Sequence, residues 1–272
     1  MIDATDPRWL ALALDDLRLE GYAVIANFFD RRLIESTRPA LYSAHDDVKA
    51  AVGAERLARA GELGVVRIPF LFSDVFFEYL RLPPVLELID ATVGNTAILH
   101  LMNGFILPSA APDKNAETVF QQSFHRDFPR YMNGYLASIN LFVAIDPFTK
   151  HNGATLVVPG SHQQDVAPPD DYMRARAIPV VADAGSLLLF DSTLWHAAGQ
   201  NTSGGDRLAM NIQVTRSFFK QQIDYVRAIG SAKILELPER SQQLLGWYTR
   251  VVTSLDEYYR PEAERLYRRG QG

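Results

Sequence analysis

The feature that most constrains the fold is a series of short apolar segments that begins after residue 95. They are rich in Val, Ile, Leu and Phe, and Pro-Gly, Asn-Gly and Gly-Gly pairs lie between them. The segments are residues 97–107, 136–145, 155–158, 178–181, 186–190 and 208–215. Several short strands at such spacing predict a sandwich or a barrel. We therefore expect a mainly β core.

Helical patterns flank this core on both sides. Asp6-Pro7 precedes an apolar pattern that predicts a helix ending at Gly21, with Asp6 as the N-cap. The other expected elements are a strand at 22–26 and helices from Asp30 towards Val48, at 85–92, at 223–229 and at 241–255. We expect one domain over residues 1–272, with a helical part at about 1–95, the β core at about 96–218 and C-terminal helices at about 219–272.

Composition excludes several classes of function. The 272 residues are 47% hydrophobic and 22% charged, which is typical of a folded globular chain. The net charge of −5 leaves no basic excess for a nucleic-acid partner. With no cysteine, the chain can form no disulfide, iron–sulfur cluster or thiol nucleophile, so a metal site must use His, Asp or Glu. No leader or membrane-spanning segment is recognised, and we expect a cytoplasmic protein with no membrane partner. The sequence indicates no oligomeric state.

The first candidate site is His125-Arg126-Asp127. In an extended segment the first and third side chains point to one face, so His125 and Asp127 could bind one metal ion. His196 follows an apolar strand and a turn; alone, it could equally be a core histidine. Together the three residues form a two-His-one-carboxylate set, which leaves coordination positions open and suits non-haem Fe(II). A Zn²⁺ hydrolase or isomerase could use the same set.

Arg207 stands eleven positions after His196, across a turn and at the start of the last predicted strand. Its guanidinium could bind a carboxylate through two hydrogen bonds. The alternative is a surface arginine paired with Asp206.

Longer motifs carry a family resemblance. Residues 152–162 (NGATLVVPGSH) resemble the hallmark segment of the phytanoyl-CoA dioxygenase (PhyH-like) family of Fe(II)- and 2-oxoglutarate-dependent oxygenases. Residues 185–196 followed by Arg207 resemble the family's distal segment, and residues 22–29 resemble its N-terminal opening. The resemblance covers roughly residues 10–218 and implies a double-stranded β-helix core of the jelly-roll or cupin-like kind, flanked by N- and C-terminal α-helices.

The resemblance also implies roles for single residues. His125, Asp127 and His196 would bind Fe(II), and Arg207 would bind the distal carboxylate of 2-oxoglutarate. Gln122 and Thr155 match positions that bind the cosubstrate in one branch of the family. The chain departs from several relatives at Ala198, where they have a hydroxyl residue, so one hydrogen bond to the cosubstrate is in doubt.

The implied reaction uses O₂ and 2-oxoglutarate, releases succinate and CO₂, and hydroxylates or otherwise oxidises a C–H bond of a small molecule. Lysines are few, which disfavours an acyl-CoA, and the 15 Phe, 11 Tyr and 3 Trp fit a moderately apolar compound such as a natural-product intermediate. The alternatives are a mononuclear metal hydrolase or isomerase and a non-catalytic β-helix binding protein. Candidate substrate contacts are Phe128, Arg130, Tyr131, Met132, Asn133, Arg67, Phe70 and Phe72.

Overall fold

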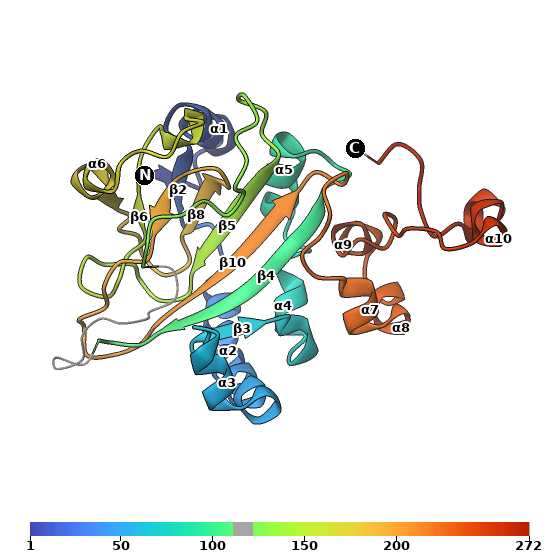
Figure 1. Ribbon diagram of the computed structural model, residues 1–272, viewed down its shortest axis with the longest axis horizontal. Helices are drawn as coiled ribbons and strands as arrows, with labels where there is room; N and C mark the ends of the chain where they lie inside the picture. Colours follow the sequence, from blue (N-terminus) through green and yellow to red (C-terminus); the bar gives the residue numbers. More distant parts are fainter. Residues whose placement is uncertain (111–121, 272) are drawn as a thin grey trace.

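Two β-sheets form the centre of the molecule. The computed structural model describes residues 1–110 and 122–271 (Figure 1). The seven-stranded sheet has the order β1 (Ile2–Asp3), β2 (Tyr22–Ala26), β8 (Leu187–Asp191), β5 (Ser138–Ala144), β10 (Arg207–Thr215), β4 (Ile98–Leu107) and β3 (Val65–Arg67). The three-stranded sheet has the order β7 (Ile178–Pro179), β6 (Leu156–Val157) and β9 (His196–Ala197). Only the β1–β2 pair is parallel in the described part, and the other strand pairs are antiparallel.

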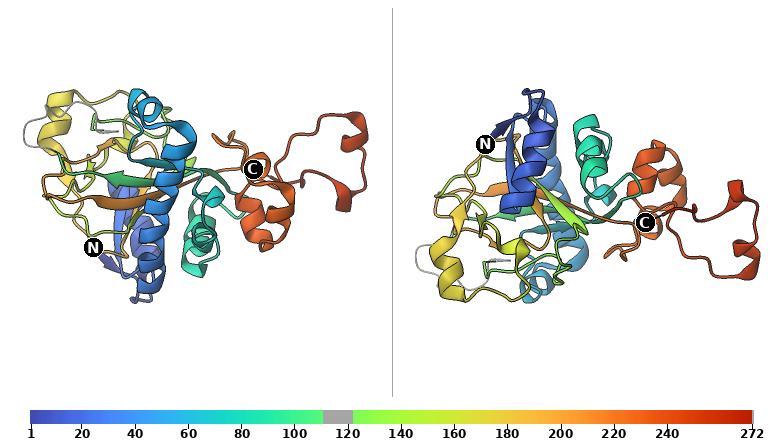
Figure 2. Two further views of the ribbon diagram at one scale, coloured as in Figure 1. Left: turned by 90° about the horizontal axis from the view of Figure 1, so that it is seen from below. Right: turned by 90° about the horizontal axis from the view of Figure 1, so that it is seen from above.

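Helices pack on the outer face of the large sheet (Figures 1 and 2). They are α1 (Trp9–Glu20), α2 (Arg31–Val52), α3 (Ala54–Arg59), α4 (Val75–Glu78) and α5 (Pro83–Thr92). Alternate strand residues such as Leu141, Met210 and Ile212 join these helices in the main apolar core. Because strand side chains alternate between faces, the other residues of β5 and β10 point towards the small sheet.

The remaining helices are short. Helix α6 (Asp170–Arg176) lies between β6 and β7 along the chain, and α7 (Tyr225–Ile229), α8 (Ser231–Leu235), α9 (Glu239–Leu244) and α10 (Leu255–Tyr258) follow the last strand. Three 3₁₀ helices span Pro69–Leu71, Ser161–Gln163 and Glu262–Glu264. Figure 1 shows α10 at the end of an arm that projects away from the sheets. Within residues 1–110 and 122–271, none of the helices has the length and apolar character that crossing a bilayer requires.

The β-rich cupin-like core agrees with the sequence prediction, but the description "mainly β" is not supported. Helical residues outnumber strand residues, because long helices cover the large sheet. The predicted strands are present within a few residues of their expected bounds. The first helix begins at Trp9, since the Asp6 side chain accepts a hydrogen bond from the backbone N–H of Arg8 and forms a separate turn. The helix predicted over 241–255 ends at Leu244, where Gly246 adopts a left-handed conformation (φ 86°).

Gly21 is the residue at which the first helix must turn into β2. Its φ is 84°, and a Cβ atom there would lie 2.4 Å from His162 Nδ1 and 2.7 Å from Leu194 Cδ1. We expect Gly21→Ala to lower the free energy of unfolding by about 2–4 kcal/mol, as backbone strain and overpacking add. Gly160→Ala is the matched control: its backbone is also left-handed (φ 74°, ψ −6°), but nothing lies within 4 Å of its Cβ position. It should cost only about 1–2 kcal/mol. If urea unfolding shows equal losses of stability for the two variants, close contact with His162 and Leu194 adds nothing to the cost at Gly21.

Candidate metal centre

A β-bridge brings the two histidines together. The backbone N–H of His125 donates to His196 O at 3.0 Å, and the N–H of His196 donates to His125 O at 3.1 Å. Asp127 lies two residues along the first segment, with Oδ1 3.5 Å from His125 Nε2 and 3.8 Å from His196 Nε2. One ligand atom from each residue lies within 4.8 Å of the other two. A divalent ion about 2.0–2.2 Å from each atom fits this spacing.

The hydrogen bonds of the two histidines leave Nε2 of each ring available for a metal ion. His125 Nδ1 lies 2.9 Å from Ser123 O, and His196 Nδ1 lies 3.0 Å from Leu194 O. When each Nδ1–H donates to its carbonyl, each Nε2 carries a lone pair that can bind a metal. His125 Nε2 is buried and makes no hydrogen bond within the described residues.

Charge in this group also suits a cation. Burial alone would raise the pKa of the Asp127 carboxyl, but the two neighbouring histidines hold it below its usual range. Burial lowers the pKa of His196, so its imidazole is neutral. Burial likewise lowers the pKa of His125, but Asp127 outweighs this and the net shift is upward. The site therefore offers an ionised carboxylate that attracts a proton or a metal ion.

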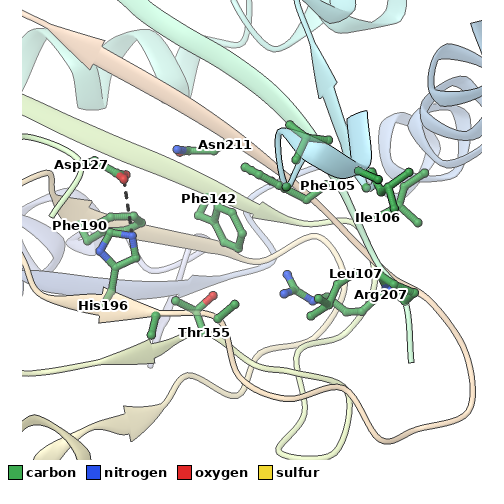
Figure 3. A pocket seen from close by; sticks show the side chains of 18 residues that line it. Phe105, Ile106, Leu107, Asp127, Phe142, Thr155, Phe190, His196, Arg207 and Asn211 are labelled. Carbon is green, nitrogen blue, oxygen red and sulfur yellow. Dashed lines mark ion pairs between the residues drawn. The ribbon is translucent and has the colours of Figure 1, made fainter. Parts of the chain in front are cut away.

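A cavity of about 210 Å³ extends between the two sheets from Asp127 and His196 to Arg207 (Figure 3). Arg207 is 3% exposed, and its guanidinium carbon lies 4.9 Å from the ring centre of Phe148. Its Nη2 donates to Gly153 O at 3.1 Å, whereas Nη1 and Nε are buried and have no partner in the described part of the chain. Burial lowers the pKa of Arg207 to about 10, so it remains cationic at neutral pH.

Arg207 therefore needs an anionic partner. A buried charge without a counter-ion is costly, and no ion pair compensates this one among the described residues. The alternative of a surface pair with Asp206 does not fit, because Arg207 is buried and the Asp206 carboxylate instead accepts a hydrogen bond from Tyr42. The dimensions and charge of the cavity suit a small carboxylate that reaches from the metal ligands to the guanidinium.

Of the other residues considered for cosubstrate binding, some line the cavity and one does not. Thr155 and Ala198 line the cavity between His196 and Arg207. Gln122 is half-buried, directly follows the segment 111–121 that lies outside the described residues, and is not among the described lining residues. Asn211, which the sequence interpretation missed, also lines the cavity. The signal was available, since residues 207, 209 and 211 of a strand share one face.

The substrate candidates lie in different places. The ring of Phe128 packs edge-on against Phe219, with centres 5.1 Å apart, and Arg130 is exposed. Tyr131, Met132 and Asn133 line a second cavity of about 540 Å³, which also contacts α1. None of these five lines the cavity that reaches Arg207.

The three remaining candidates belong to the N-terminal half. Arg67 forms an ion pair with Glu62. Phe70 is buried against Phe77 with ring centres 4.6 Å apart, and Phe72 packs on the small cluster that contains Leu57. Phe70 and Phe72 therefore contribute to the apolar packing of the helices.

The side chain of Arg126 points away from His125 and Asp127 and holds their segment against residues 161–165. It donates to the backbone carbonyls of Gln164, Ser161 and Asp165, and it lies 5.0 Å from the ring centre of Trp195. Trp195 directly precedes His196, so one side chain supports both ligand segments.

We expect Arg126→Met to weaken Co²⁺ binding by about 10- to 100-fold, the usual effect of losing support behind metal ligands. Titration of the visible Co²⁺ absorption measures this affinity. Arg130→Met is the matched control, because Arg130 is exposed in the same segment. Equal Co²⁺ affinity in the wild-type protein and Arg126→Met would exclude this supporting role.

Comparisons with known proteins show which proteins this chain resembles. The chain is 57% identical over 258 residues to the uncharacterized protein Rv1501 of Mycobacterium tuberculosis, covering 95% of this chain and 94% of that protein. It is 25% identical over 254 residues to the dioxygenase aneA of Aspergillus aculeatus (86% and 81% covered), and 31% identical over 137 residues to the dioxygenase cdmD of Talaromyces verruculosus (47% and 44% covered).

A solved structure shares the fold. It is a complex of the non-heme monooxygenase ThoJ with nickel, with a TM-score of 0.57, 21% identity, and coverage of 78% of this chain and 80% of that one. The model of the phytanoyl-CoA dioxygenase (PhyH) family matches residues 17–209, which include every candidate metal ligand and Arg207. The chain therefore belongs to the phytanoyl-CoA dioxygenase family of oxygenases.

Proposed function

We propose that this protein is an Fe(II)- and 2-oxoglutarate-dependent oxygenase that hydroxylates or otherwise oxidises an unactivated C–H bond of a small molecule, with release of succinate and CO₂. One observation carries the proposal: the buried guanidinium of Arg207, which has no ion-pair partner among the described residues, lies at one end of a cavity, and Asp127 and His196 of the two-His-one-Asp group line the other end. 2-Oxoglutarate has complementary chemistry, with a keto acid at one end and a carboxylate at the other.

The residues of the cavity have distinct roles in this proposal. His125, Asp127 and His196 hold Fe(II), which, when bound, supplies the binding position and the electrons for O₂. Arg207 binds the distal carboxylate and fixes the direction of the cosubstrate. Thr155 donates a hydrogen bond to the cosubstrate from the cavity wall, and Gln122 is proposed as a second contact.

Aromatic residues complete the cavity wall. Phe105, Phe142 and Phe190 line it, and the ring centre of Phe190 lies 4.8 Å from that of His196. Apolar rings exclude water from the space between the metal ligands and Arg207. In such a space the charged contact to Arg207 is stronger than it would be in water.

The alternatives account for less of the site. A Zn²⁺ hydrolase or isomerase would use the three metal ligands, but it has no need for an unpaired buried arginine in the same cavity. A non-catalytic binding protein could use Arg207, but it has no need for three ligand atoms grouped within 4.8 Å.

Succinate formation separates these functions. The metal-free protein is incubated with 2-oxoglutarate, O₂ and ascorbate, together with Fe(II), Zn(II) or no metal. We expect succinate to form only in the sample that contains Fe(II), at the slow rate typical of turnover without the organic substrate. Under the same conditions, Arg207→Ala should form no succinate. If Fe(II) binds and no succinate forms, or if Zn(II) supports equal turnover, the proposal is wrong.

A further inference from the structure

A row of three polar side chains crosses the large sheet beside the metal centre. Strand pairing places Arg67 of β3 opposite Asn103 of β4, and Asn103 opposite Asn211 of β10. Asn211 lines the cavity together with Asp127, and Figure 3 shows its side chain directed towards that carboxylate.

The row lies on the inner face of the sheet. Gly104 faces the outer helices, because a Cβ atom there would lie 2.3 Å from Leu41 Cδ2 of α2. Its neighbours along the strand, Asn103 and Phe105, therefore face inward, and Phe105 lines the cavity. The side chains of directly opposed residues such as Asn103 and Asn211 lie close enough to contact one small group.

The carbonyl oxygen of each asparagine lacks a hydrogen-bond partner among the described residues. Asn103 is 3% exposed and Asn211 is 7% exposed, and Oδ1 of each is buried with no partner among the described residues. Gln213, on the same face of β10, differs: its Nε2 donates to Ser138 Oγ at 3.2 Å. Buried polar groups without partners are rare; Asn211 lines the cavity and Asn103 lies directly beside it on the neighbouring strand, so the two Oδ1 atoms indicate a ligand.

We propose that Asn103 and Asn211 recognise a neutral amide or lactam group of the organic substrate and hold it beside the metal centre. This inference rests on the proposed function and adds the chemical class of the substrate. A lactam presents an N–H donor next to a carbonyl acceptor. The two asparagines present carbonyl acceptors and N–H donors side by side, so they can satisfy both.

Nearby charges favour a neutral group over an ion. Neither asparagine carries a charge that could neutralise an ionic group of the substrate, and a buried ion without a counter-charge is costly. Arg67 is already paired with Glu62, its Nε lying 3.2 Å from Glu62 Oε2, so its charge is matched. A cation near the three ligands would be repelled by the bound Fe(II).

Asn103 and Asn211 also lie apart from Arg207, the residue proposed to bind the distal carboxylate of 2-oxoglutarate. Asn211 lies four residues beyond Arg207 on the same face of β10, about 13 Å along the strand. Arg207 anchors the far end of 2-oxoglutarate, and the asparagine pair anchors the substrate at the metal end.

The test uses the full chain loaded with Zn(II) and N-oxalylglycine, a 2-oxoglutarate analogue that is not decarboxylated. The probes are δ-valerolactam and cyclohexanone, rings of equal size of which only the lactam has an N–H. Ligand-observed NMR titration measures both affinities. We expect the lactam to bind about 3- to 10-fold more tightly, as one neutral hydrogen bond provides. Since one Oδ1 atom accepts the lactam N–H, at least one of Asn103→Leu and Asn211→Leu should remove this preference, and Asn95→Leu, an exposed position, should keep it.

Equal binding of the two probes by the wild-type protein would overturn the inference, and so would a lactam preference that survives in both variants. N-oxalylglycine binding, measured in the same samples, tests the proposed function separately. If N-oxalylglycine does not bind, the cosubstrate assignment is wrong. If it binds but the lactam is not preferred, only the asparagine inference is wrong. Thermal melting checks the fold. If a leucine variant does not fold, Asn103→Ser and Asn211→Ser replace it, with the same expected loss of preference.

Discussion

Alanine at His125, Asp127 or His196 is expected to abolish Fe(II) binding and succinate formation. The three residues supply the ligand atoms that lie within 4.8 Å of one another, so each replacement leaves two protein ligands. Since losing support behind a ligand already weakens metal binding by about 10- to 100-fold, losing a ligand itself should exceed about 100-fold. Equilibrium dialysis against Fe(II) without O₂ measures the affinity, and succinate formation measures turnover.

A histidine outside the group provides the control for these variants. His151 is exposed, so His151→Ala should bind Fe(II) like the wild-type protein. The ligand assignment would be refuted by near-normal iron content and turnover in any one of the three alanine variants. Thermal melting of the metal-free variants confirms that each loss arises in a folded chain.

Arg207→Ala is expected to weaken 2-oxoglutarate binding strongly while leaving metal affinity unchanged. Removing one partner of a buried charged contact costs about 2–5 kcal/mol, which corresponds to about 30- to 5,000-fold in affinity. The reason is that Arg207 is 3% exposed and that two of its guanidinium nitrogens have no partner within residues 1–110 and 122–271. Calorimetric titration of the Zn(II)-loaded protein with 2-oxoglutarate measures the change.

Conservative variants identify which property of Arg207 matters. Arg207→Lys retains the charge but cannot form two parallel hydrogen bonds, so it should fall between the wild-type protein and Arg207→Ala. Thr155→Ala and Gln122→Ala should show smaller shifts in the same direction. An unchanged 2-oxoglutarate affinity in Arg207→Ala would refute the cosubstrate assignment, whatever happens to turnover.

The sequence by itself indicated the strands and the candidate ligands, because these features are local. Apolar segments between turn residues predicted β4, β5, β8 and β10 within a few residues. The spacing of His125 and Asp127 predicted a shared face, and the motif around residues 152–162 indicated the family that the comparison confirms. The helix predicted over 241–255 was wrong, because apolar periodicity did not reveal that Gly246 adopts a left-handed conformation.

Only the tertiary structure decided which distant residues meet. Periodicity gives the face of a strand, but the partner and register depend on packing between segments that lie far apart in the chain. For this reason local patterns could not predict the pairing of Asn103 with Asn211 or the placement of Tyr131 in a separate cavity. Nor could they predict that Arg207 is buried with no ion-pair partner in the described part of the chain. The sequence indicated which side chains could bind a metal ion and a carboxylate, and the packing of the two sheets placed Asp127, His196 and Arg207 around one cavity.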